Sequence, residues 1–129
     1  MAEVRPRSGR FGVITQLGTA RDVISRKSRF DQYSLVYTLG LYDYFSDRVA
    51  KRLTKALFAT LASEGKLLIA NFMPSIRDVG CVECFLDWWL VYLDRKTMEG
   101  LVSEVPESKS QHIFLDPPLA NCVLKVVQR

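Results

Sequence analysis

The hydrophobic pattern of the chain predicts two parallel strands joined by a helix. Residues 33–39 (YSLVYTL) and 66–72 (KLLIANF) are apolar and β-prone with no regular polar face, as is typical of strands buried on both faces. Between them, residues 46–63 repeat apolar side chains at helical spacing; Ser46 is expected to cap this helix and Gly65 to stop it. A strand, a helix and a strand in this order form a βαβ unit with a right-handed crossover.

The second half of the chain predicts two more helices and a hairpin. Apolar side chains at helical spacing indicate helices near 80–93 and 95–105, and Asp94 is placed to cap the second. Residues 111–116 and 122–127 are β-prone and flank a PPLAN turn, which predicts an antiparallel hairpin that extends the sheet. We therefore expect a three-layer α/β domain with a mixed sheet.

The first thirty residues differ in character from the rest. Residues 1–11 contain Pro, Gly, Ser and Arg with little apolar matter and are expected to form a disordered basic leader, which leaves 12–129 as a single domain. A short strand is expected at 13–17, followed by a short helix that Thr19 caps. Seven basic residues face two acidic ones in residues 1–30. This excess could hold nucleic acid, but a solvated arm is the favoured interpretation, because no interleaved aromatic surface accompanies it.

The composition argues against a membrane-spanning, a disulfide-rich and a zinc-binding protein. The 129 residues are sufficient for one domain with a core, and the most apolar stretch, CFLDWWLVYL, is too short to span a membrane and contains Asp87. Three cysteines form no disulfide scaffold, which favours a reduced, cytoplasmic protein. Cys81 and Cys84 form a C-x-x-C pair, but its spacing to His112 and Cys122 matches no zinc module. We expect neither a metal site nor a Cys–His nucleophile.

Three stretches together resemble a known family. They are YSLVYTLGLYDYFSDRVAKRL, GKLLIANF and FLDWWLVYLD, and the likeness continues into the terminal IFLDPPLANCVLKVV. Over roughly residues 13–129 the chain is similar to the C-terminal half of a class I S-adenosylmethionine-dependent methyltransferase. The resemblance is greatest to a bacterial group associated with methyl esters of hydroxy fatty acids. It implies a Rossmann-like mixed sheet in which residues 33–39 form the family's fourth strand and 66–72 its fifth.

The resemblance also implies where a ligand would lie. Thr19 and Ala20 would lie near the adenine of the methyl donor. The residues that would line the donor and acceptor pocket are Thr38, Gly40, Leu41, Tyr42, Asp43, Tyr44, Asn71, Phe72, Asp87 and Trp88. A purely structural interpretation stays open: Asp43 caps a turn, Asn71 ties down a loop, and the Trp88–Trp89 pair serves mainly for packing.

The strands that normally precede this half are missing. The sequence contains no G-x-G turn and no matching acidic strand end, and these elements hold most of the methyl donor in relatives. We therefore expect no cofactor for the isolated chain, and its catalytic residues are unknown.

Three functions follow from this pattern. The favoured one is a non-catalytic methyltransferase-fold remnant that is oligomeric or binds a small molecule. The alternatives are an S-adenosylmethionine-dependent methyltransferase completed by a separate chain, and a nucleic-acid-binding module. The loss of neighbouring strands predicts a homodimer, with residues 13–39 and the Trp88–Trp89 region as its interface.

Overall fold

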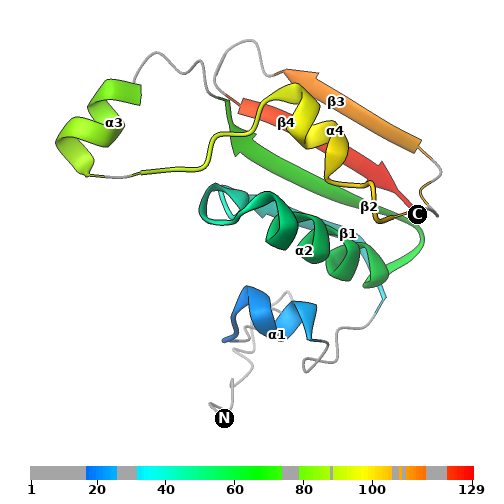
Figure 1. Cartoon of the computed structure of the whole chain (residues 1–129). Helices are drawn as coiled ribbons and strands as arrows, with labels where there is room; N and C mark the ends of the chain where they lie inside the picture. Colours follow the sequence, from blue (N-terminus) through cyan, green and yellow to red (C-terminus); the bar gives the residue numbers. More distant parts are fainter. Residues whose placement is uncertain are drawn as a thin grey trace, which may run out of the picture.

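A four-stranded mixed sheet organises the chain (Figure 1). The computed structural model describes residues 17–25, 32–73, 79–87, 89–105, 108, 110–115 and 122–129. The strands lie in the order β1-β2-β4-β3. β1 (Tyr33–Leu39) pairs in parallel with β2 (Leu61–Phe72); β4 (Cys122–Gln128) is antiparallel to both β2 and β3 (Ser110–Leu115). The strands predicted over 33–39 and 66–72, the terminal hairpin and the mixed α/β class are thereby confirmed.

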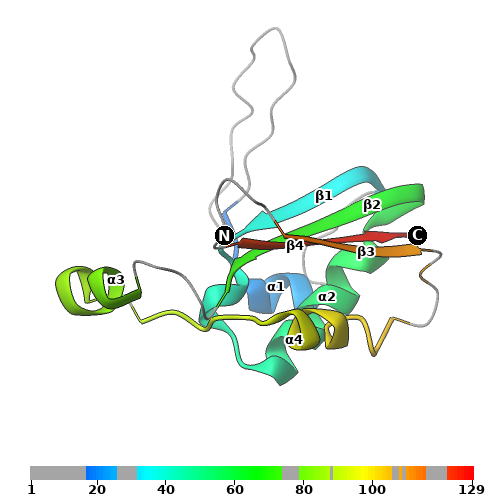
Figure 2. The ribbon, with the colours of Figure 1, turned by 90° about the horizontal axis from the view of Figure 1, so that it is seen from above.

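Helices cover one face of this sheet. Figure 2 shows α1 (Ala20–Ile24), α2 (Asp47–Ala59) and α4 (Arg95–Gly100) together on one side, with α3 (Val79–Leu86) beyond the end of the strands. Of the three layers expected, the described residues supply the sheet and one helical layer. The core lies between them, and its fully buried side chains include Leu53, Leu67, Ile69, Met98, Leu101 and Val127.

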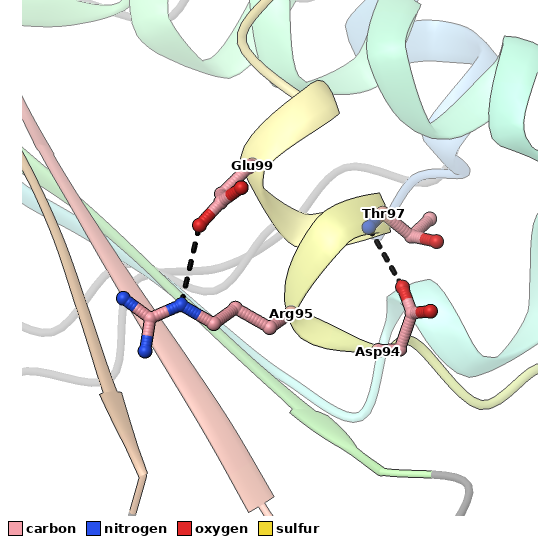
Figure 3. Close-up of polar contacts among 4 residues, drawn as sticks. All are labelled: Asp94, Arg95, Thr97 and Glu99. Carbon is pink, nitrogen blue, oxygen red and sulfur yellow. Dashed lines mark hydrogen bonds and ion pairs between the residues drawn. The ribbon is translucent and has the colours of Figure 1, made fainter.

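The predicted caps have different outcomes. Thr19 and Asp22 form a complete capping box at α1: the Asp22 N–H donates to the Thr19 hydroxyl at 3.3 Å, and the Thr19 N–H donates to the Asp22 carboxylate at 2.8 Å. At α4 the Thr97 N–H donates to the Asp94 carboxylate at 2.7 Å, and Arg95 and Glu99 form an ion pair one turn apart (Figure 3). Ser46 occupies the N-cap of α2 but makes no capping hydrogen bond with its side chain.

The helix over 46–63 is shorter than predicted, and Gly65 does not stop it. α2 ends at Ala59, and Leu61 already belongs to β2, where it pairs with Tyr33 and is fully buried. The β1–β2 register then shifts, and regular pairing resumes at Lys66. Within this irregularity Glu64 has a φ of 64°, so residues 62–65 form a bulge inside β2 rather than a helix terminus.

The helices predicted over 80–93 and 95–105 also end early. α3 stops at Leu86 because Asp87 has a φ of 47°, and the backbone beyond it bonds to the sheet instead of continuing the helix. The side chains of Phe85, Leu86 and Trp89 are exposed rather than part of the predicted buried stripe. α4 ends at Gly100, and the turn that follows buries Leu101 and Val102 without helical structure.

β1 is not buried on both faces as its composition predicted. Tyr33, Leu35, Tyr37 and Leu39 are all exposed, because the described helices cover only the other face. Among the described residues β1 also lies at the edge of the sheet, and an unpaired edge of this kind tends to pair with another strand.

The predictions for the amino-terminal residues lie mostly outside the described part of the chain. The leader over 1–11 and residues 13–16 of the expected strand belong there, as do all the basic residues of 1–30 except Arg21. Leu17, the last residue of that expected strand, is described and is exposed and not in a strand. Among the described residues, no helix has the length and apolar character needed to cross a membrane.

Candidate functional site

A cavity of about 540 Å³ lies at the carboxyl ends of β1 and β2, the end of a parallel sheet at which α/β proteins generally bind ligands. It is lined by Leu39, Gly40, Leu41, Asp43, Tyr44, Ala70, Asn71 and Phe72. Gly40 turns the chain out of β1 with a φ of 65°, and its N–H donates to the Ala70 carbonyl at 3.1 Å. This conformation favours glycine and brings the following turn over the end of β2.

Asn71 holds the segment around Val91 against the end of β2. Its amide nitrogen donates to the carbonyls of Phe72 (3.3 Å) and Val91 (3.2 Å). The backbone contributes two further bonds, from the Val91 N–H to the Asp43 carbonyl at 2.7 Å and from the Leu93 N–H to the Phe72 carbonyl at 3.0 Å. The structural interpretation of Asn71 as a loop tether therefore applies to its side-chain nitrogen, while its buried oxygen Oδ1 has no hydrogen-bond partner.

Asp43 is a buried carboxyl group, only 2% exposed. Burial raises its pKa to about 6, although hydrogen bonds from the Phe72 backbone and the Asn71 side chain oppose the shift. Its Oδ1 has no hydrogen-bond partner. Because the pKa in the fold lies above the ordinary value, the protonated group stabilises the fold, and this contribution is lost as the pH rises through about 6.

Tyr42 points into the core rather than into the cavity. Its side chain is fully buried, and its hydroxyl lies 2.8 Å from Thr54 Oγ1, which in turn donates to the Ala50 carbonyl at 2.8 Å. Burial raises the pKa of Tyr42, so this hydroxyl stays neutral. It anchors the turn of η1 (Tyr42–Tyr44) to α2, and thereby holds the neighbouring Asp43 in place.

The structure brings together most of the pocket residues that the resemblance implied. Gly40, Leu41, Asp43, Tyr44, Asn71 and Phe72 all line the cavity, but Thr38 and Tyr42 do not. The sequence analysis missed Leu39 and Ala70, which are apolar strand residues. These two residues directly precede Gly40 and Asn71, and this position could have predicted them as lining residues, because the cavity lies at the strand ends.

The remaining candidates lie elsewhere or cannot be placed. Thr19 and Ala20 belong to the start of α1, where the Thr19 hydroxyl is engaged in the capping box, and neither lines the cavity. Asp87 is exposed and accepts a hydrogen bond from Trp89 Nε1 at 3.0 Å. Trp88 lies outside the described residues.

The residues that were considered as zinc ligands, and from which no metal site was expected, lie on separate elements. Cys81 and Cys84 are exposed on α3, and the ring of His112 stacks on Phe114 in β3. The side chain of Cys122 is not among those described. Within the described part of the chain, no group of three or more His, Cys, Asp or Glu side chains could hold a metal ion.

Comparison with known proteins relates the fold to methyltransferases. No protein-family model and no curated protein matches the chain. Solved structures do match. The S-adenosylmethionine-dependent methyltransferase SibL matches with a TM-score of 0.63 and 13% identity, over 82% of this chain and 33% of SibL. The N-methyltransferase NodS of Bradyrhizobium japonicum WM9, in complex with S-adenosyl-L-homocysteine, matches with a TM-score of 0.52 and 14% identity over 82% of this chain and 50% of NodS.

A third match belongs to the same group. Magnesium protoporphyrin IX methyltransferase from Synechocystis PCC 6803, with bound S-adenosylhomocysteine, has a TM-score of 0.52 and 9% identity over 77% of this chain and 46% of its own. The chain thus has a methyltransferase-like fold but spans only a third to a half of the length of these proteins. At such low identities the likeness concerns the fold alone.

Proposed function

We propose that the chain binds a small amphiphilic molecule in the cavity at the ends of β1 and β2, and that alone it does not transfer methyl groups. The observation that carries this proposal is the lining: it combines apolar side chains with Asp43 and Asn71, whose buried Oδ1 atoms have no hydrogen-bond partner. Buried polar atoms are normally paired. A ligand with an apolar body and a hydrogen-bond donor would satisfy both parts of this lining.

Octanol is expected to raise the midpoint of thermal unfolding, because a ligand that binds only the folded state stabilises it. Leu41→Trp should reduce this shift by filling the cavity with a larger side chain at a partly exposed lining position. Leu17→Trp, at an exposed position outside the lining, is the matched control. Equal shifts in the wild type and in both variants would place octanol elsewhere and contradict the proposal.

A second candidate is S-adenosylmethionine-dependent methyl transfer completed by a separate chain. The edge of β1, which is unpaired among the described residues, favours it, since this chain covers only 33% of SibL and 50% of NodS. The cavity does not fit the whole methyl donor, because among the described residues that line it only Asp43 and Asn71 have charged or amide side chains. The donor's adenine, ribose and amino-acid parts would need more polar contacts than these.

Calorimetry with the isolated chain is expected to detect weak binding of S-adenosylmethionine or none. The physical reason is that positioning the donor depends on contacts that this cavity lacks. A Kd in the low micromolar range, about −7 to −8 kcal/mol, would contradict this expectation. A partner chain that co-purifies and confers such affinity would support the second candidate instead.

We also propose that the chain forms a homodimer through β1. This strand has no charged residue, an unpaired outer edge among the described residues, and four exposed large apolar side chains. Such an edge promotes pairing with another strand unless something covers it. A second copy of β1, related by a two-fold axis, is self-complementary and would extend the sheet across the dimer.

A further inference from the structure

We propose that the polar end of the bound molecule is a protonated amine attached to an apolar body. This inference rests on the proposed binding function and specifies the chemical class of the ligand. It derives from two side chains of the cavity lining, Asp43 and Asn71, each of which has a buried acceptor oxygen, Oδ1, without a hydrogen-bond partner.

The first argument is the missing counter-charge of Asp43. The carboxyl group is 2% exposed, yet the ion pairs among the described residues are Lys51–Asp47 and Arg95–Glu99, and neither involves it. Buried carboxylates are normally paired with a cation or coordinate one. Since its pKa of about 6 leaves the group charged at neutral pH, a cationic ligand would supply the partner that the described residues do not.

The second argument concerns the orientation of the Asn71 amide. Its nitrogen faces two backbone carbonyls, those of Phe72 and Val91, and carbonyls only accept hydrogen bonds. If the amide were flipped, its oxygen would lie next to these two carbonyl oxygens and repel them. The oxygen therefore stays on the other side as a second buried acceptor, and an ammonium group has three donors with which to reach both Asn71 and Asp43.

The third argument is the character of the remaining lining. Leu39, Leu41, Ala70 and Phe72 offer an apolar surface around the two acceptors. A strongly hydrated dication or a small inorganic cation would gain nothing from it. An apolar chain or ring gains by removing its surface from water, so an amphiphilic amine matches the cavity better than a free metal ion.

The test compares three probes with the same apolar chain: octylamine, octanol and octanoate. At pH 7.5 we expect octylamine to bind the full chain about tenfold or more tightly than octanol, as a charge-assisted hydrogen bond in a buried site would give. Octanoate should bind most weakly, because its carboxylate would face Asp43. The measurement is calorimetry, with the thermal shift as a second readout.

Asp43→Asn separates recognition from folding. The variant should lose the preference for octylamine over octanol yet unfold at a temperature equal to or above that of the wild type, because it removes a buried, unpaired charge. Asp47→Asn, which deletes an equal charge from the exposed face of α2, should retain the preference. Both variants keep Tyr92 and Glu83 unchanged. The Tyr92 hydroxyl donates a hydrogen bond to the Glu83 carboxylate, and the charge of Asp43 is one of the causes that raise the pKa of Tyr92.

The outcomes distinguish this inference from the function on which it rests. Equal affinities for octylamine and octanol, both reduced by Leu41→Trp, would overturn the amine assignment and leave the cavity as a binding site. Binding of none of the three probes would overturn both. A preference for octylamine that persists in Asp43→Asn would show that another group selects the charge, and would also overturn the inference.

Discussion

Replacing Gly65 with alanine is expected to lower the free energy of unfolding by about 1–3 kcal/mol, the usual cost of forcing extra atoms into a packed site. A Cβ at this position would lie 2.8 Å from the Tyr33 carbonyl oxygen, 2.9 Å from that of Ala62 and 3.1 Å from the Leu61 Cβ. Two of these neighbours are backbone atoms that cannot turn aside as a side-chain end can. The first residue of β1 would therefore have to separate from the bulge in β2.

Gly80→Ala is the matched control, because a Cβ there would meet no atom within 4 Å. Gly80 lies in α3, where alanine is the better helix former, so no loss of stability is expected. Urea unfolding followed by circular dichroism measures both variants, at one protein concentration because dimerisation would make stability depend on it. An unchanged stability in Gly65→Ala would mean that the contact between β1 and the bulge is not rigid.

Gly65 also shows where the sequence was insufficient. Glycine after a run of helical periodicity normally indicates a helix terminus, but the same residue allows close backbone approach inside a bulge. The burial of Leu61 and its pairing with Tyr33 favour the bulge over a helix terminus. Local sequence does not contain that long-range pairing, whereas the apolar run over 66–72 sufficed to predict the regular part of β2.

The end of α3 illustrates a second limit. The helical spacing of apolar residues continues through Trp89 and Leu93, but the backbone of Val91 and Leu93 bonds to Asp43 and Phe72 instead. These partners are far away in sequence, so periodicity alone favoured the helix. The position of the site was more predictable, because Asp43 and Asn71 lie at the carboxyl ends of two strands that were predicted to be parallel. Only the structure shows that no described residue forms an ion pair with Asp43.

Leu35→Lys is expected to convert the proposed homodimer into monomers. The Leu35 side chain lies on the exposed side of the edge strand β1. In a two-fold symmetric dimer the substitution removes this leucine from both protomers. Each buried leucine contributes about 1.5–3 kcal/mol, so the two losses should weaken the dimer at least about a hundredfold, and an edge lysine opposes strand pairing as well. Sedimentation velocity at micromolar concentration measures the change.

Phe114→Lys is the control that identifies the mode of association. Phe114 is also exposed, but it lies on β3, at the opposite edge of the sheet from β1. If the copies pair along β1, this variant should remain dimeric, because its substitution lies three strands away from the shared edge. If both variants dissociate, the copies instead stack through the bare face of the sheet, and pairing along β1 is wrong. A wild-type chain that is monomeric and folded at micromolar concentration would contradict the homodimer itself.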